Sequence, residues 1–370
     1  MVTKNQYVIL TGSKNNAGDY LIKYRAKKLL ALLRPDRSVI DYDGWKPFSK
    51  EQVIEINESK ALILLGGPAL QSGMRSRIYP MVNNLAEISI PIIMLGVGYK
   101  GVEGTWEETY NYPLDEGSVE LLRKINASGF MSSVRDYHTL NVLRQKGFNN
   151  FIMTGCPALY SLDHLNKQVE FKSKPEKIGF SLGVSYYRSS SMEKQMKDLI
   201  FLLSKKTEFN LEVLFHHKID RSILKQNKFV EWLEKEHINY KDISGSENGL
   251  IDSYSACDLH IGYRVHAHIF CCSISKPSVL LSEDGRGVAL KEVIGGLSLK
   301  AYTGYGNQLT LKAANKMGLY DIFKTDPGFA QDVVNNLEYE IEQKYPRISL
   351  CRKAIDGYYT QMQKVISQLP

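Results

Sequence analysis

Short apolar runs alternate with longer, helix-patterned segments along most of the chain, and this alternation restricts the fold more than any other feature of the sequence. Five apolar runs occur in the N-terminal half: Gln6–Thr11, Ala61–Leu65, Ile92–Leu95, Phe130–Val134 and Phe151–Thr154. The segments between them, such as Asp19–Leu33, place apolar residues at helical spacing. Strand-length runs that alternate with helices are typical of a parallel sheet covered by helices.

A polar segment over residues 166–177 interrupts this pattern, which then starts again. Further strands are expected at Lys177–Leu182, Leu211–Phe215, Leu259–Tyr263 and Ser278–Leu281. We therefore predict an α/β fold with two facing Rossmann-like, doubly wound domains, which is a GT-B-like arrangement. The expected parts are an acceptor-side domain over 1–168, a donor-side domain over 175–330 and a helical tail over 331–370, whose packing on the first domain is left open. Ligands of such sheets bind at the carboxyl ends of the strands, so we expect the active site in the cleft between the domains.

Composition narrows the class of protein and of partner. The 370 residues are 43% hydrophobic and 24% charged, which excludes a largely disordered chain. The net charge of +7 suits an anionic substrate, an anionic membrane surface or nucleic acid. Because the basic residues are scattered and no zinc-finger or RNA-binding signature occurs, nucleic acid is not expected as a partner.

The cysteines and the apolar stretches indicate in which cellular compartment the protein is expected. The five cysteines are odd in number and include an adjacent pair, Cys271-Cys272, so they form no disulfide framework. The first residues are polar, and no apolar stretch approaches the length of a membrane span. We expect a cytoplasmic protein with reduced thiols, and leave open peripheral contact with the inner face of the membrane and formation of a homo-oligomer.

Glycine-containing turns follow the first strands, and glycine lets a ligand approach the backbone closely. The turn after the first strand contains Asn16 and Gly18, and Asp19 opens the next helix. Backbone N–H groups, Asn16 and Asp19 can face a polar ligand at that helix N-terminus, and a purely structural turn is the alternative. Gly67 and Gly98 follow two later strands. These turns match neither the P-loop nor the dinucleotide fingerprint.

The segment Ser133-Val134-Arg135-Asp136 lies where the fourth run ends and a helix begins. Asp136 is therefore a candidate N-cap. Arg135 would stand at the carboxyl end of the strand beside a helix N-terminus, where a cation strengthens the attraction for an anion. The alternative is a surface ion pair between Arg135 and Asp136.

The strongest candidate site is the turn after Leu259–Tyr263. Arg264 and His266 occupy this strand-to-helix turn, the position that Arg135 takes in the first domain. If the domains face each other, two guanidinium groups and an imidazole converge on one anion. Arginine presents a planar fork that suits carboxylate or phosphate, and histidine is the usual residue for moving a proton near neutral pH.

Other histidines and one arginine are weaker candidates. His266 and His268 stand at i and i+2 at a helix start, on different faces, so we expect no metal site. His268 and His260 are expected as core or supporting histidines. His217 and Arg286 follow two strands of the second domain and are candidate substrate contacts, with exposed turns as the alternative.

In its motifs the chain resembles the polysaccharide pyruvyl transferase family from Gly12 to about Gly295. The resemblance rests on the following elements: Asn16-Ala17-Gly18-Asp19, Gly66-Gly67-Pro68-Ala69-Leu70, Gly96-Val97-Gly98, Ser133-Val134-Arg135-Asp136, Gly155-Cys156-Pro157-Ala158-Leu159 and Arg264-Val265-His266. The arginine–apolar–histidine element contributes most. This sequence has Pro68, Cys156 and Val265 where the family more often has glycine, an acidic residue and leucine.

The resemblance implies a GT-B-like transferase that moves the pyruvyl unit of phosphoenolpyruvate onto a hydroxyl pair of a sugar. The acceptor is a surface glycan or a lipid-linked glycan precursor in exopolysaccharide or cell-wall synthesis, the product is a pyruvate ketal, and no cofactor is expected besides the donor phosphoenolpyruvate. Arg135 and Arg264 would hold the donor's carboxylate and phosphate, with His266 as general acid and Asp19 as base on the acceptor side. Substrate contacts are expected from Asn16, Gly18, Gly67, Gly98, Ser133, His217 and Arg286. The alternative is a GT-B glycosyltransferase that uses a sugar nucleotide, with Glu283 or Asp284 on the ribose.

Overall fold

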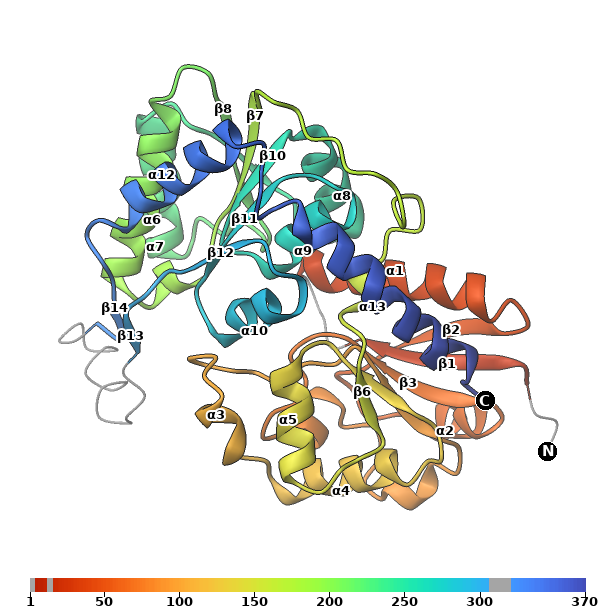
Figure 1. Cartoon of the computed structure of the whole chain (residues 1–370). Helices are drawn as coiled ribbons and strands as arrows, with labels where there is room; N and C mark the ends of the chain where they lie inside the picture. Colours follow the sequence, from red (N-terminus) through yellow and green to blue (C-terminus); the bar gives the residue numbers. More distant parts are fainter. Residues whose placement is uncertain (1–3, 12–15, 306–320) are drawn as a thin grey trace. The chain divides into compact units, whose positions relative to one another are not determined.

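The chain divides into two compact units in the computed structural model, which describes residues 4–11, 16–305 and 321–370 (Figure 1). The first unit contains residues 4–11, Asp19–Leu165 and Ala354–Pro370. The second contains residues 16–18 and the described part of Asn166–Lys353. Most of the second unit is thus inserted into the first in sequence, and residues 331–370 are shared between the two.

The first unit is built on a four-stranded parallel sheet in the order β2-β1-β3-β4. The strands are β1 (Gln6–Thr11), β2 (Ser38–Asp43), β3 (Ala61–Leu65) and β4 (Ile92–Leu95). The central strands β1 and β3 are buried along their whole length, as expected for a sheet covered on both faces. From β1 the chain moves outward to β2, and from β3 it moves outward in the opposite direction to β4. The carboxyl ends of β1 and β3 therefore flank a topological switch point, where α/β sheets bind ligands.

Two short strands continue this unit beyond β4. They are β5 (Ser132–Val134) and β6 (Phe151–Met153), which pair in parallel. β5 lies beside the carboxyl end of β4: the backbone N–H of Gly96, directly after β4, donates to the Ser133 carbonyl at 3.0 Å. Asp136 is the N-cap of the helix after β5, and its carboxylate accepts from the Thr139 backbone N–H at 2.7 Å. This confirms the predicted N-cap.

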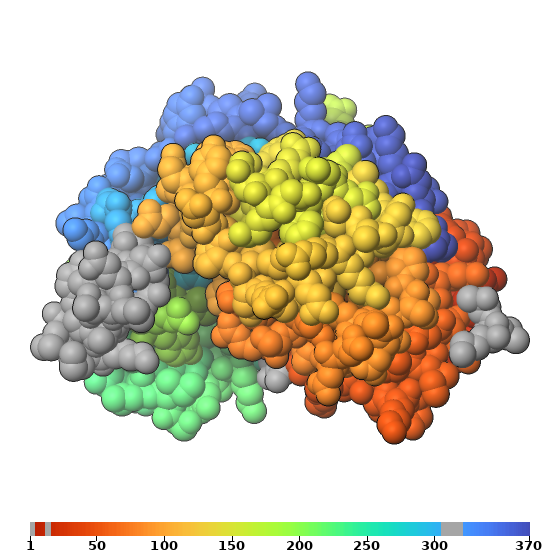
Figure 2. Space-filling view, turned by 90° about the horizontal axis from the view of Figure 1, so that it is seen from below, coloured from red at the N-terminus to blue at the C-terminus, as the bar shows by residue number. Residues whose placement is uncertain are grey.

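Helices cover the sheet of the first unit, and some form its outer surface in the view of Figure 2 (gold to yellow). They are α1 (Ala17–Leu33, in this unit from Asp19), α2 (Lys50–Asn57), α3 (Glu107–Tyr110), α4 (Glu116–Asn126) and α5 (Tyr137–Gln145), with the short η1 (Met74–Ile78), η2 (Leu85–Glu87) and η3 (Pro157–Leu159). The last helix, α13 (Leu350–Ser367), belongs to this unit from Ala354 onward. The Tyr7 hydroxyl donates to the Pro370 carbonyl at 2.8 Å, and the rings of Tyr160 and Tyr359 pack with centroids 5.4 Å apart. Residues 354–370 therefore complete the first unit.

The second unit contains a six-stranded parallel sheet in the order β12-β11-β10-β7-β8-β9. The strands are β7 (Lys177–Ser181), β8 (Asn210–Phe215), β9 (Asn239–Asp242), β10 (Leu259–Gly262), β11 (Ser278–Ser282) and β12 (Leu297–Lys300). The chain moves outward from β7 to β9 on one side and from β10 to β12 on the other. The switch point of this sheet thus lies between β7 and β10, directly before Leu182 and Arg264.

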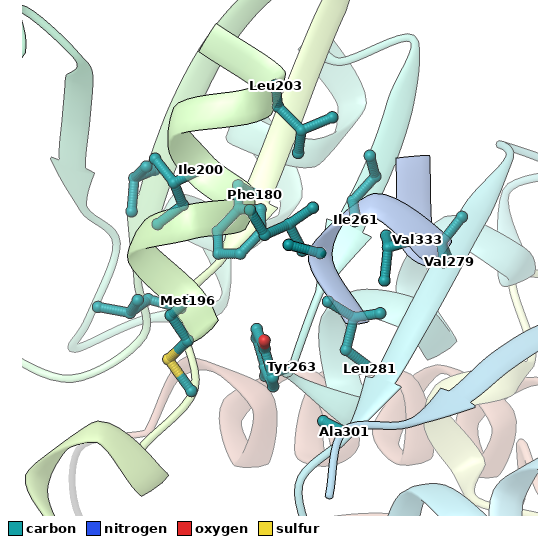
Figure 3. Packing of buried hydrophobic residues seen from close by; sticks show 14 of the residues in the cluster. Phe180, Met196, Ile200, Leu203, Ile261, Tyr263, Val279, Leu281, Ala301 and Val333 are labelled. Atoms are coloured by element: carbon teal, nitrogen blue, oxygen red, sulfur yellow. The ribbon is translucent and has the colours of Figure 1, made fainter. Parts of the chain in front are cut away.

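The main core of the second unit lies on one face of its sheet (Figure 3). Apolar side chains of the central strands, such as Phe180, Ile261 and Leu281, pack against Met196, Val333 and their neighbours. These neighbours come from α6 (Ser190–Ser204), α7 (Leu224–Lys235) and α12 (Phe329–Glu342). The helices α8 (Glu247–Ala256), α9 (Val265–Ser273) and α10 (Gly285–Ile294) make up the remaining α-helices of this unit, besides the first residues of α1 and α13, in the described ranges.

Smaller elements complete the description. They are η4 (Ser185–Tyr187) and the two-residue antiparallel strands β13 (Gly304–Tyr305) and β14 (Phe323–Lys324). Within the described residues, no helix has both the length and the apolar character that a membrane span requires.

Candidate functional site

Arg264 lies at the switch point of the second unit. It is the N-cap residue of α9 with an extended backbone, because the chain turns there from β10 into the helix. Its backbone N–H donates to Ser181 Oγ at 3.0 Å, and its side-chain Nε donates to the Leu182 carbonyl at 2.8 Å. Both partners are at the end of β7, so the neighbouring strand fixes the direction of the guanidinium group. The terminal nitrogens of the guanidinium make no hydrogen bond within the described part of the chain.

A small pocket adjoins Arg264 at the carboxyl ends of β7, β8 and β10. It is lined by Leu182, Gly183, Tyr186, Tyr187, Phe215, His216, His217, Gln226 and Arg264. Tyr186 and Tyr187 stack with ring centroids 4.2 Å apart. The guanidinium of Arg264 therefore lies beside aromatic rings and imidazoles in one pocket of the second unit. Sequence reasoning missed the tyrosines, because nothing in their local pattern shows that they reach this edge of the sheet.

The charges around Arg264 have opposing effects on its pKa. Burial lowers the pKa of its guanidinium, the Glu283 carboxylate raises it and the Arg286 guanidinium lowers it. An arginine stays charged at neutral pH under such shifts. Burial, followed by the charge of Arg264, lowers the pKa of His216 well below its usual range and that of His217 to about 4. Both imidazoles are thus neutral at pH 7, and the guanidinium is the cation beside them.

Glu283 is engaged inside the second unit. It is 5% exposed, and its carboxylate accepts from the backbone N–H groups of Val184 and Ser185, both at 2.9 Å. The carboxylate therefore holds the loop after β7. Asp284 in turn binds Arg286 through contacts of 2.6 and 2.9 Å and caps α10. The two acidic residues considered for a ribose contact thus already have partners in the protein.

His266 lies in the first turn of α9 and is 8% exposed. It packs closely on Gly18, which groups with the second unit. A Cβ atom at Gly18 would lie 2.2 Å from His266 Nδ1, so this approach requires glycine. Asn16 is in the same turn, and its side-chain oxygen accepts from the Gly18 backbone N–H at 3.2 Å. The three residues of the predicted site therefore form one structural group.

In the first unit, Arg135 follows β5 and is 6% exposed. Its Nε donates to Asp136 Oδ2 at 3.2 Å, and one terminal nitrogen donates to the Tyr99 carbonyl at 3.1 Å. The ion pair with Asp136 therefore exists but is buried, so the alternative of a surface pair does not hold. A Cβ atom at Gly98 would lie 1.9 Å from Arg135 Nε, so the guanidinium rests directly on the Gly98 backbone.

The other predicted residues of the first unit lie at neighbouring strand ends. Asp19 is in the first turn of α1, and a Cβ atom at Gly67 would lie 3.8 Å from its Oδ1. Ser133 is fully buried, and its hydroxyl accepts from the Gly96 backbone N–H at 2.9 Å, so it ties β5 to the end of β4. Burial raises the pKa of the Cys156 thiol to about 11; among smaller effects, the charge of Arg135 lowers this pKa and that of Asp19 raises it. Arg135 and Asp19 thus act on one buried thiol within this unit.

One further residue of the first unit escaped sequence analysis. Tyr79 is fully buried, and its hydroxyl has no hydrogen-bond partner among the described residues. Burial and the negative charge of Asp19 both raise its pKa. Tyr79 precedes a proline in an irregular segment, so no periodicity marks it.

The first unit therefore gathers Asp19, Gly67, Gly98 and Arg135 at the carboxyl ends of its strands, and the second gathers Arg264, His217 and Arg286 at the ends of its own. Each group offers a guanidinium for an anion next to groups that can bind or move protons. Among the described residues, no set of three or more His, Cys, Asp or Glu side chains is placed to hold a metal ion.

Solved structures with a similar fold cover nearly the whole chain. UDP-GlcNAc 2-epimerase from Neisseria meningitidis bound to UDP-GlcNAc superposes with a TM-score of 0.55 and 11% identity, over 97% of this chain and 98% of that chain. MnaA from S. aureus with UDP gives 0.52 and 12% identity, over 91% and 97%. Anabaena Alr3699/HepE with UDP and glucose gives 0.50 and 12% identity, over 98% and 97%. These likenesses confirm the predicted GT-B fold.

Sequence comparison adds the family. No curated protein matches the chain, but the family model for polysaccharide pyruvyl transferase matches residues 16–285. The matched range contains Asn16, Asp19, Arg135, Arg264 and His266, and it ends just before Arg286. Because the model covers most of the chain, the protein belongs to the polysaccharide pyruvyl transferase family and is a transferase.

Proposed function

We propose that the protein transfers the pyruvyl unit of phosphoenolpyruvate to two hydroxyls of one sugar and forms a cyclic pyruvate ketal. The acceptor is a surface glycan or a lipid-linked glycan precursor. Phosphoenolpyruvate is the only donor in this scheme, and no further cofactor takes part.

The observation that carries this proposal is the state of Arg264. Its Nε is bound to the Leu182 carbonyl, whereas its terminal nitrogens carry no hydrogen bond in the described part of the chain. A guanidinium that is oriented in this way can offer two parallel N–H donors to a phosphate or carboxylate. Its place at the switch point between β7 and β10 is where α/β sheets bind their ligands. Arg286 also acts on the charge of Arg264, although it is paired with Asp284.

Arg135 is proposed to act on the same donor from the first unit. It is buried against Gly98, with one of its two terminal nitrogens bound to the Tyr99 carbonyl. The other terminal nitrogen is not engaged within the described residues and can bind an oxygen of the donor. Phosphoenolpyruvate carries a carboxylate and a phosphate, so it provides an anionic group for each of the two arginines.

The proposed reaction begins when the methylene carbon of phosphoenolpyruvate takes up a proton and becomes a methyl group. The adjacent carbon gains oxocarbenium character, and the first sugar hydroxyl bonds to it and releases a proton. The bond from this carbon to the phosphate oxygen then breaks. The second hydroxyl bonds to the same carbon, releases its proton and closes the ring. The products are the ketal and hydrogen phosphate: one of the two released protons replaces the one taken up by the methylene carbon, and the leaving phosphate takes up the other.

His266 and Asp19 are the proposed proton donor and acceptor. His266 stands two residues after Arg264 in the first turn of α9, and in this scheme it gives its proton to a donor bound to that arginine. Asp19 stands in the first turn of α1 and takes the proton of a sugar hydroxyl. The arginines stabilise the negative charge that develops on the leaving phosphate.

The test combines binding with turnover. Thermal unfolding is followed with phosphoenolpyruvate and, separately, with a panel of sugar nucleotides. A ligand at 100 times its Kd that binds only the folded protein adds about 2.7 kcal/mol to stability. Phosphoenolpyruvate is expected to raise the Tm, and 31P NMR is expected to show phosphate release that depends on an added glycan acceptor.

Variants locate the effect. Arg264→Ala and Arg264→Lys should both lose the shift in Tm, because lysine retains the charge but not the fork or the bond to Leu182. Arg221→Ala is the control, since Arg221 is exposed and pairs with Glu234 in the same unit. Stabilisation by a sugar nucleotide alone would overturn the proposal, as would Arg264→Ala with an unchanged response to phosphoenolpyruvate.

A further inference from the structure

A chain of buried polar side chains crosses the centre of the second unit's sheet and ends at Arg264. Ser181 Oγ on β7 lies 2.8 Å from His260 Nε2 on β10. His260 Nδ1 lies 2.7 Å from Ser278 Oγ on β11, and the same oxygen lies 2.7 Å from His268 Nδ1 on α9. Each of the four side chains is at most 1% exposed. We call Ser181, His260, Ser278 and His268 the serine–histidine chain.

Each contact within this chain can be assigned one donor and one acceptor, and the remaining His268 Nε2–H lies 3.7 Å from Cys272 Sγ. Burial lowers the pKa of His260 well below its usual range and that of His268 to about 3, so both imidazoles are neutral at pH 7 and carry one N–H each. The Arg264 backbone N–H donates to Ser181 Oγ at 3.0 Å. In the assignment we adopt, the Ser181 hydroxyl donates to His260 Nε2, His260 Nδ1–H donates to Ser278, and the Ser278 hydroxyl donates to His268. The serine–histidine chain thus runs in one direction away from Arg264.

The backbone beside Ser181 approaches it closely. Gly262 is the register partner of Ser181, and a Cβ atom there would lie 2.5 Å from Ser181 Oγ. The same Cβ would lie 2.4 Å from the Ser181 carbonyl oxygen, so glycine is required by the close approach of the two strands, and its lack of a side chain also leaves the space that the Ser181 hydroxyl occupies. The alternate residues of the same strands, such as Phe180 and Ile261, face the apolar core. Apolar side chains on this face would also fill a core, so stability alone does not require buried histidines and serines.

We propose that the serine–histidine chain is a positioning device that fixes the backbone of Arg264 and thereby aims its guanidinium at the donor. Arg264 is an N-cap without a side-chain cap bond, so its backbone is held at Ser181 and its side chain at the Leu182 carbonyl. Loss of the Ser278 hydroxyl leaves Nδ1 of His260 and Nδ1 of His268 without this partner. His260 is then held only by Ser181. Ser181 and Ser278 are therefore positioning residues for donor binding. The identity of the donor rests on the proposed function.

Two measurements test this proposal. Hydrogen–deuterium exchange at the Arg264 amide reports the bond to Ser181 without any ligand, and titration calorimetry reports the Kd for phosphoenolpyruvate. In Ser181→Ala and Ser278→Ala, exchange at Arg264 should become at least about tenfold faster. The Kd should rise about tenfold, which corresponds to about 1.4 kcal/mol. Ser181→Thr, which retains the hydroxyl, should restore both values most of the way.

Ser298→Ala is the matched control. Ser298 is a buried serine on β12 whose hydroxyl lies 3.1 Å from that of Ser282, outside the serine–histidine chain. It should leave exchange at Arg264 and the Kd within about twofold of the parent protein, although it removes a similar buried hydrogen bond. If the alanine variants do not fold, Ser278→Cys, which has nearly the same size but is a weak hydrogen-bond partner, replaces them in the comparison.

The outcomes separate the two proposals. Folded Ser181→Ala and Ser278→Ala proteins with unchanged exchange at Arg264 would show that the chain does not position this residue. A parent protein that does not bind phosphoenolpyruvate would overturn the proposed function, and the exchange measurement would still decide the inference. Slower folding or a lower Tm in all three alanine variants alike, with no change specific to Arg264, would reduce the chain to core packing and also overturn it.

Discussion

Glu283 binds the loop after β7, and the loss of stability on its replacement can be worked out from its individual hydrogen bonds. Oε2 of Glu283 accepts from both Val184 and Ser185, at 2.9 Å each, and the side chain is 5% exposed. Glu283→Ala leaves two backbone N–H groups without this acceptor. A buried donor without a partner costs about 1–3 kcal/mol, so this variant should destabilise the second unit by about 2–6 kcal/mol.

Glu283→Gln distinguishes the acceptor from the charge. Both short bonds go to Oε2, and the Val184 N–H also lies 3.2 Å from Oε1. The amide oxygen of glutamine can take the place of Oε2. The variant should therefore keep both hydrogen bonds and lose only their charge-assisted part, at a cost of about 1 kcal/mol. Glu208→Ala, which removes an exposed carboxylate of the same unit, should change stability by less than about 0.5 kcal/mol.

The assay must report the second unit alone, and the sequence provides a probe for this. Trp232 is the only tryptophan of the second unit, since the others are Trp45 and Trp106. Urea unfolding followed by fluorescence in a Trp45→Phe, Trp106→Phe background therefore reads this unit. Equal losses in the alanine and glutamine variants, or a loss below about 1 kcal/mol in Glu283→Ala, would refute the view that the carboxylate holds the loop through these two bonds.

Three further predictions concern other parts of the molecule. Gly98→Ala should displace Arg135, because the new Cβ would lie 1.9 Å from its Nε; phosphoenolpyruvate binding should weaken while the fold persists, and unchanged binding would contradict this. The unfolded imidazole of His268 titrates near 6.5 and the folded one near a pKa of about 3, so the unfolded chain takes up the proton first. The second unit should therefore lose stability as pH falls from about 6.5 toward 3, and His268→Gln should reduce this slope in urea unfolding; an unchanged slope would refute the assignment. Burial raises the pKa of the Cys156 thiol to about 11, so labelling with a disulfide reagent at pH 7.5 should require unfolding, and prompt labelling of Cys156 in the native protein would show that the thiol is accessible.

The strands that sequence predicted best are the buried ones. β1, β3 and β4 have the bounds expected from their apolar runs, because central parallel strands are apolar on both faces. β2 and β9 were not predicted, since these edge strands contain polar residues and none of their residues is fully buried. Their place in the sheet depends on pairing with a distant strand and not on their own composition.

The candidate site shows the same division. Arg135 and Arg264 could be placed at strand ends, because a strand-to-helix turn leaves a local signal in the sequence. The tyrosines beside Arg264 and the buried hydroxyl of Tyr79 could not be predicted, since their place depends on how separate segments pack. Ser133 was expected to contact substrate, yet its hydroxyl binds the Gly96 backbone. A hydroxyl that can hydrogen-bond a ligand can also hydrogen-bond the protein's own backbone, and the sequence alone does not show which of the two it does.

The contact of Tyr7 with the Pro370 carbonyl has a consequence for the order in which the protein is made. The first unit needs residues 354–370, which leave the ribosome only after the whole of the inserted unit. The second unit can therefore fold first during synthesis, although most of the other unit precedes it in the chain. Until residues 354–370 arrive, Tyr160 and the surface around it lack their cover, and an apolar face stays open to chaperones and proteases. A protein that ends just before Ala354 should consequently keep a folded second unit, and its proteolysis should begin in the first unit.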